Sequence, residues 1–174
     1  MNRVRQKKEF DLYDLMQNVA LGALACHSFI LGYYKVARHK NNKYSYPKLD
    51  YMFYVLPIVY HKDTMETFKS SYQLYTAIPN NKEVVLGLQE RANKMVQQTF
   101  DSLNLAFSKK IIGYNSDKKT VELLYGYMSD KILISANLGS ENKVKKIQDS
   151  AYKLGNIFAK NDEKNIQLEL NIRF

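Results

Sequence analysis

The sequence predicts an α+β protein that is predominantly helical, with a helix bundle around one amphipathic helix and a small antiparallel sheet. Three observations predict this fold: a helical apolar stripe over residues 81–107, an apolar helical stretch that ends near residue 37, and strand-like segments after residue 107. Hydrophobic residues make up 45% and charged residues 25% of the 174 positions, as in an ordinary globular protein. We therefore expect a single domain over residues 1–174, with residues 1–9 as a flexible basic N-terminus.

The first predicted helix, residues 10–37, becomes apolar on nearly all sides after Val19. A helix of this kind is in contact on more than one face, so it is either central or intermolecular. Gly22 and Gly32 each cost about 1 kcal/mol relative to Ala in a helix. They therefore suggest close approach by another element, although Gly32 could equally lie near a helix end. The apolar run falls short of the ~20 residues that a membrane span needs, so a buried helix explains it better.

The predicted central helix covers residues 81–107. Asn80 and Glu83 have the spacing of a capping box and mark its start. Its apolar residues fall three or four positions apart, as one stripe on a helix requires. They are Val84, Leu88, Ala92, Met95, Thr99, Leu103 and Phe107.

The sheet is predicted from two regions. Residues 110–124 have two short strand-like runs around Asn115, Ser116 and Asp117, which favours a hairpin. Residues 166–172 alternate apolar and polar side chains, which predicts a half-buried C-terminal strand. A last helix with an apolar row from Val144 to Phe158 precedes that strand.

The sequence has no recognisable set of catalytic, cofactor-binding or metal-ligating residues. The only cysteine, Cys26, lies in an apolar run, which suits a structural thiol in a reducing cytoplasm. His27 is adjacent to Cys26, so on a helix their side chains diverge by about 100° and cannot form a nucleophile and base pair. We expect a cytoplasmic protein that is not an enzyme and needs no cofactor.

The formal net charge of +9 raises the possibility of a nucleic-acid partner. The alternative function is therefore a DNA-binding module of winged-helix type, with the 110–124 hairpin as its wing and contact to the DNA backbone. The alternative explanation of the positive charge is a Lys-rich composition that places cations on every solvated face. The candidate nucleic-acid contacts are Arg38, Lys40 and Lys43 in a polar loop, with Lys109, Lys110, Lys118 and Lys119 around the hairpin.

Aromatic residues are unusually frequent, with 14 Tyr and 8 Phe. Since aromatic side chains are favoured at the centres of protein interfaces, part of this set could contact a partner protein, although core packing would use the same residues. The candidate contact or packing residues are Gly22, Phe29 and Tyr33 in the first helix, and Tyr51, Phe53 and Tyr54 in the segment that follows the polar loop.

Several ordered segments resemble the middle-component family of three-component ABC systems. They are LGALACHSFILGYY, PKLDYMFYVLPIVYH, NNKEVVLGLQERANKMVQQTFDSLNLAF and AYKLGNIFAKNDEKNIQLELNIRF. The resemblance runs from about residue 15 to residue 174 and departs at Asn171, where a Gly is expected. It implies no catalytic residues. It implies a small adaptor or regulator between two partners from the same operon, a coiled-coil ABC ATPase and an effector protein, in a bacterial anti-phage or conflict system.

Overall fold

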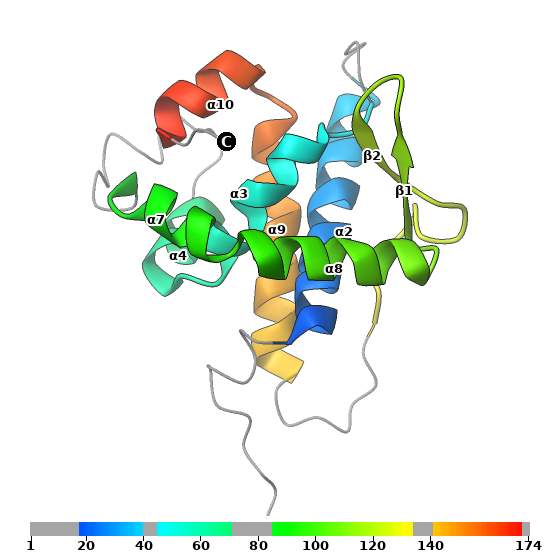
Figure 1. Ribbon diagram of the computed structural model, residues 1–174, viewed down its shortest axis with the longest axis horizontal. Helices are drawn as coiled ribbons and strands as arrows, with labels where there is room; N and C mark the ends of the chain where they lie inside the picture. The colour runs from blue at the N-terminus through cyan, green and yellow to red at the C-terminus, as the bar shows by residue number, and fades with distance from the viewer. Residues whose placement is uncertain (1–17, 40–44, 71–84, 134–140, 172–174) are drawn as a thin grey trace, which may run out of the picture.

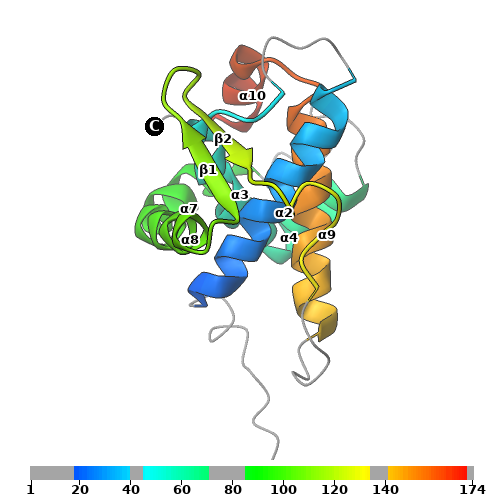
Figure 2. The same cartoon turned by 90° about the vertical axis from the view of Figure 1, so that its right-hand side faces the viewer.

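The computed structural model describes residues 18–39, 45–70, 85–133 and 141–171. Two long helices lie side by side and run in the same direction through the middle of the protein (Figures 1 and 2). They are α2, Val19–Ala37, and α9, Glu141–Phe158. Because α2 contacts α9, α8, α3 and β2, it is the helix around which the others pack.

Shorter elements surround this pair and form a predominantly helical α+β fold, which confirms the predicted fold class. They are the 3-10 helix η1 (Leu49–Tyr51), α3 (Met52–Val59), α4 (Lys62–Ser70), α7 (Leu88–Lys94), α8 (Val96–Ser108), β1 (Ile112–Asn115), β2 (Thr120–Leu123) and α10 (Glu163–Leu170). Figure 1 shows α8 crossing in front of α2 at a steep angle.

Glycines allow α2 to be approached closely from two sides. A Cβ at Gly32 would lie 2.0 Å from the carbonyl oxygen of Tyr152 in α9, and a Cβ at Gly155 would lie 2.1 Å from the carbonyl oxygen of Phe29 in α2. A Cβ at Gly22 would lie 2.1 Å from Ser102 Oγ in α8. Both glycines singled out in the first helix are therefore points of close helix packing.

Helix α2 is long and apolar enough to cross a membrane by length and composition alone, with a mean hydropathy of 1.3. In this fold 67% of its apolar window is buried. Its apolar surface on several sides is covered by α9, α8 and α3, as expected of a core helix.

The prediction of one continuous helix over residues 81–107 is wrong, because the described part of this segment forms two helices, α7 and α8. Its first residues, 81–84, lie outside the described ranges, and Gly87 has a left-handed backbone with φ of 73° that separates Leu86 from α7. A second break separates α7 from α8 at Met95, whose φ and ψ are −99° and 3°. The Thr99 hydroxyl donates a hydrogen bond to the Met95 carbonyl at 2.9 Å, and a back-bond of this kind bends helices. The apolar stripe itself is confirmed, because Leu88, Ala92 and Leu103 are buried. The centre of the bundle is α2 instead.

The predicted hairpin is confirmed. Strands β1 and β2 pair in antiparallel register from Ile112 opposite Leu123 to Asn115 opposite Thr120. The segment before η1 lies along the other edge of β2, since Val121 N donates to Pro47 O at 2.9 Å. This contact fixes the hairpin beside the start of η1.

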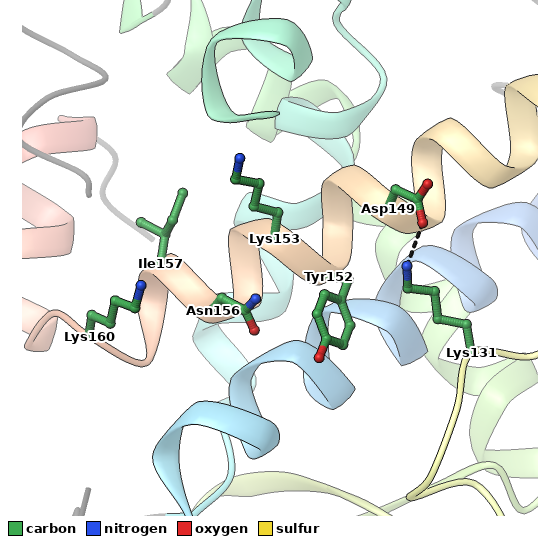
Figure 3. A pocket seen from close by; sticks show the side chains of 7 residues that line it. All are labelled: Lys131, Asp149, Tyr152, Lys153, Asn156, Ile157 and Lys160. Atoms are coloured by element: carbon green, nitrogen blue, oxygen red, sulfur yellow. Dashed lines mark hydrogen bonds and ion pairs between the residues drawn. The ribbon is translucent and has the colours of Figure 1, made fainter. Parts of the chain in front are cut away.

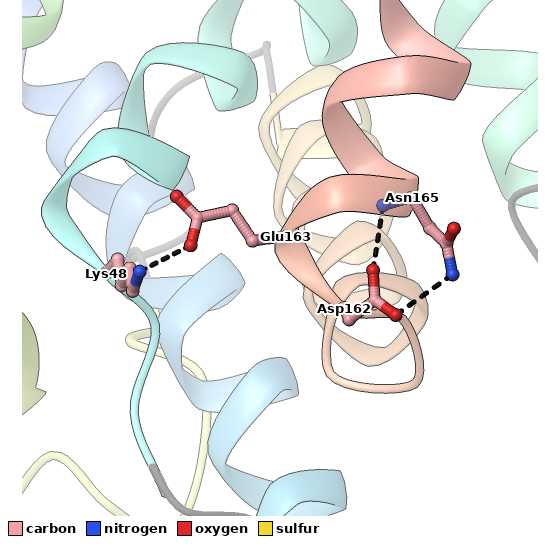
Figure 4. A network of polar contacts seen from close by, with 4 residues as sticks. All are labelled: Lys48, Asp162, Glu163 and Asn165. Carbon is pink, nitrogen blue, oxygen red and sulfur yellow. Dashed lines mark hydrogen bonds and ion pairs between the residues drawn. The ribbon is translucent and has the colours of Figure 1, made fainter.

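The predicted C-terminal strand over residues 166–172 is wrong, because α10 occupies Glu163–Leu170. Asp162 caps this helix by accepting a hydrogen bond from Asn165 N at 2.8 Å (Figure 4). Ile166 and Leu170 are fully buried, whereas Leu168 is 67% exposed. Burial therefore repeats every four residues, as in a helix, and not every two, as in a strand.

Candidate interaction surfaces

Four of the six candidate partner contacts form an aromatic cluster inside the chain. The rings of Phe29, Tyr51 and Tyr54 surround Phe158 of α9, with centroid distances of 5.4, 5.6 and 5.7 Å. Tyr33 lies against Tyr51 at 6.2 Å. These aromatic candidates are buried in this chain, with exposed fractions of 8% or less, so they pack the core and a partner cannot reach them in this fold.

The other two candidates differ from each other. Gly22 is buried at the crossing of α2 and α8. Phe53 is half-buried on α3, and its ring meets Phe100 of α8 with a centroid distance of 5.0 Å. Phe53 is therefore the predicted contact residue that lies nearest the surface, beside Phe100, which was not predicted and is 44% exposed.

The predicted nucleic-acid contacts divide between the two ends of the hairpin. Lys109 and Lys110 follow α8 and precede β1, whereas Lys118 and Lys119 form the turn between β1 and β2. Strands of four residues span roughly 13 Å, so the two lysine pairs lie well apart.

Arg38 is connected to β2 through two tyrosine rings. It lies over the Tyr34 ring at 5.6 Å, Tyr34 stacks on Tyr46 at 4.9 Å, and the next residues pair with β2. Lys40 and Lys43 lie outside the described residues.

The residues with reactive side chains are held in structural roles. Cys26 is fully buried, and burial raises the pKa of its thiol to about 12. His27 is also fully buried; its Nε2 lies 3.0 Å from the carbonyl oxygen of Tyr127, so Nε2 carries the hydrogen and donates it. Burial lowers the pKa of His27. Within the described ranges, no group of three or more His, Cys, Asp and Glu could hold a metal ion.

His61 lies at the junction of α4 and α7. Its Nδ1 is 2.9 Å from Thr64 Oγ1, and Arg91 of α7 donates to the same hydroxyl at 3.4 Å. Burial, followed by the nearby Arg91 charge, lowers the pKa of His61. These three side chains join two helices and give no sign of a reactive pair.

A hollow of about 360 Å³ lies along one side of α9, and Tyr152, whose backbone meets Gly32 of α2, is among its lining residues (Figure 3). Its cations are Lys131, Lys153 and Lys160, and its one carboxylate is Asp149. Its other lining residues except Lys160 project from α9 at helical spacing, and Lys160 lies two residues beyond the end of that helix. We call this feature the α9 hollow.

Lys131 reaches the α9 hollow from the segment that follows β2. It forms an ion pair with Asp149 and lies 4.8 Å from the centre of the Tyr152 ring. The adjacent backbone is fixed because Gln148, itself buried, donates from Nε2 to the carbonyl oxygen of Ile132 at 2.9 Å. Sequence reasoning missed this hollow, although the solvated stripe Asp149, Lys153, Asn156 and Lys160 could be recognised from helical spacing alone.

Fold and surface together define a predominantly helical α+β protein with a small hairpin and a basic hollow on one core helix. The chain belongs to the family described as ABC-three component (ABC-3C) system Middle Component 3, whose model matches residues 7–174. Its family makes it one part of a system with other components. No curated protein and no solved structure matches the chain, so the winged-helix likeness stays a prediction.

Proposed function

We propose that this chain is a non-enzymatic adaptor that couples a coiled-coil ABC ATPase to an effector protein in a bacterial anti-phage or conflict system. The observation that carries the proposal is the family match over residues 7–174. A middle component acts together with other components, and contact is the simplest way for a protein of this size to link two larger partners. A fully buried Cys26 agrees with a cytoplasmic location.

The arrangement of the reactive side chains supports a role by contact. The thiol of Cys26 is protonated at physiological pH because burial raises its pKa, and the thiolate is the nucleophilic form. His27 is turned toward the Tyr127 carbonyl. Neither group is available to act on a substrate in this fold.

Co-expression with the two neighbouring components of the system tests the proposal. We expect the chain to co-elute with the ATPase component in size-exclusion chromatography, and its deletion to abolish protection against phage in cells that carry the complete system. Failure to co-elute with either component would contradict the adaptor role. A measurable turnover by the isolated chain would contradict its non-enzymatic character.

Contact with the DNA backbone is the second candidate function, and the exposed lysines at the turn of the hairpin favour it. Lys118 and Lys119 are adjacent and exposed in the turn between β1 and β2, where the tip of a wing would meet the DNA backbone. Binding to duplex DNA should then weaken steeply with added salt. The Lys118→Glu/Lys119→Glu variant should bind DNA at least tenfold more weakly than Lys109→Glu/Lys110→Glu, which has the same net charge. Equal affinities, or no binding by the wild type at low salt, would exclude this function.

A further inference from the structure

The turn that follows β2 carries the most exposed large apolar side chain of the described residues. Tyr125 is 99% exposed, and Leu124 before it is 37% exposed. Burying a tyrosine removes about 150–250 Å² from water, so this side chain could contribute a large contact that the fold itself does not use. Single exposed apolar residues are common in soluble proteins, and the way in which the backbone holds Tyr125 is what sets it apart.

Residues 124–127 form a hydrogen-bonded turn. Tyr127 N donates to the carbonyl oxygen of Leu124 at 3.1 Å, and Gly126, the third residue of the turn, has a φ of 98°. A positive φ at the third position is what a type II turn requires, and glycine adopts it without a steric penalty. Tyr125 is the second residue of this turn, and its side chain extends into solvent.

Both ends of the turn are fixed to the rest of the fold. On one side, Leu124 N donates to the carbonyl oxygen of Ile111 at 3.1 Å, which extends the pairing of the hairpin by one residue. On the other side, Nε2 of the buried His27 donates to the carbonyl oxygen of Tyr127 at 3.0 Å. Since His27 belongs to the central helix α2, the turn is attached to the most buried part of the protein. In Figure 2 the chain passes from β2 across α2 toward α9.

An exposed aromatic side chain on a fixed turn has the properties of a binding anchor. Tyrosine is enriched among the residues that contribute most to protein interfaces. A backbone that already has its bound conformation avoids the entropy cost of ordering a loop. We propose that Tyr125 inserts into an apolar pocket of another component of the system. This inference rests on the proposed function, because it names the way in which the adaptor contacts a partner.

The area of the turn argues against a second copy of this chain as the occupant. A specific and stable interface buries at least about 1,200 Å² in total. Two copies that met through their Tyr125 side chains would bury about 500 Å² at most from these residues. A pocket in a larger partner surrounds the inserted side chain and adds contacts beside it. The turn therefore fits a concave surface of a different protein.

The charges around the turn do not favour a polyanion. Residues 120–130 contain two carboxylates, Glu122 and Asp130, and no Lys or Arg. Lys109 and Lys110 are exposed at the same end of the hairpin, because they precede β1. The formal charges of these four side chains cancel. Since binding to nucleic acid depends on cations that neutralise phosphates, an apolar protein pocket fits this turn better.

Removal of the aromatic side chain tests the anchor. Tyr125→Ala should weaken binding to the partner component at least tenfold in isothermal titration calorimetry. The melting temperature of the free chain should not change, because the residue is 99% exposed. The control Leu168→Ala removes another large apolar side chain, 67% exposed on α10, and should weaken binding less than threefold. Wild-type affinity of Tyr125→Ala, or equal losses in the two variants, would overturn the proposal and leave the adaptor role intact.

Two variants of Gly126 test whether the turn presents Tyr125 to the partner. A Cβ at this position would meet no atom within 4 Å, so the backbone strain at a φ of 98° is the main effect of Gly126→Ala. This variant should weaken binding at least threefold although Tyr125 is still present. Because Asn tolerates a positive φ better than Ala, Gly126→Asn should keep more of the affinity. Equal affinities of Gly126→Ala and the wild type would overturn the role of the turn.

A photo-crosslinking amino acid, p-benzoylphenylalanine, in place of Tyr125 identifies what the turn contacts in the complex with both other components. Mass spectrometry should find a crosslink to an apolar segment of one of these components. A crosslink to nucleic acid or to a second copy of this chain, or a complex that forms without any crosslink, would overturn the proposal. If the wild-type chain forms no complex, the proposed function fails, and this inference fails with it.

Discussion

Replacing Gly155 with Ala should destabilise the protein even though Ala favours a helix. The added Cβ would lie 2.1 Å from Phe29 O and 2.7 Å from Tyr33 N, which are backbone atoms of α2. Carbon atoms in optimal contact are about 3.5–4.0 Å apart, so α2 and α9 would have to separate. Since backbone atoms cannot rotate away as a side chain does, we take the upper end of the usual cost of overpacking, about 3 kcal/mol.

The helix propensity of Ala returns about 1 kcal/mol of this cost. We therefore expect the free energy of unfolding to fall by about 2 kcal/mol, which lowers the melting temperature of a chain of this length by about 4–8 °C. Thermal and urea unfolding followed by circular dichroism measure this change. Asn142→Ala, at an exposed position of the same helix, is the control and should be neutral or slightly stabilising.

A melting temperature of Gly155→Ala equal to or above that of the wild type would refute this reasoning. The double variant with Gly32→Ala provides a further check, because the Cβ at Gly32 meets Tyr152 O across the same pair of helices. Once the helices have separated, the second methyl group fits more easily, so the combined loss should be smaller than the sum of the two single losses.

Three other results are expected. Gly22→Ala should destabilise the protein, because the new methyl group meets the Oγ and Cβ of Ser102. Adding Ser102→Gly removes both atoms and should recover most of the lost stability. A double variant no more stable than Gly22→Ala would contradict this contact. The free energy of unfolding should fall as the pH drops below about 6.5. Burial lowers the pKa of His27, so below this pH the unfolded chain binds more protons than the folded one. Urea unfolding of His27→Gln should show a weaker pH dependence, and a pH dependence equal to that of the wild type would assign the effect to other groups. Cys26 should react with a thiol reagent only after denaturant is added, because its side chain is fully buried, and rapid reaction of the native protein would contradict that burial.

The sequence predicted most elements correctly where one periodic pattern was present without competition. The C-terminal segment shows how a pattern can mislead, because Ile166 and Leu170 fit both a strand and a helix. Asp162 decides in favour of the helix by capping it, and the exposed Leu168 confirms which repeat is used. The capping residue Asp162 is thus the sequence signal that distinguishes the helix from a strand.

The break between α7 and α8 could not be predicted from the apolar stripe, because the stripe continues across it. The bend at Met95 accompanies one local hydrogen bond from Thr99, and threonine in a helix makes such a bond only in some cases. The aromatic residues pose a different difficulty. Phe29 and Phe158 are far apart in the sequence, so nothing in the order of residues reveals that they cover each other.

Only part of the α9 hollow could be predicted from the sequence, for a similar reason. The residues that α9 contributes to its hollow follow from helical spacing. Lys131 comes from an irregular segment, and its position depends on contacts with Gln148 and Asp149 that have no periodic signal. Surface features built from two segments of this kind become visible only in three dimensions.

The parallel pairing of α2 and α9 has a consequence for how the protein is made. Helix α2 is synthesised well before α9, the helix with which it makes its main contact. Until then the face of α2 that packs against α9 remains exposed, in a state that is prone to aggregation or to capture by chaperones. A ribosome that stops before residue 141 would release a chain that lacks this cover, so only chains that extend through α9 should accumulate in soluble form.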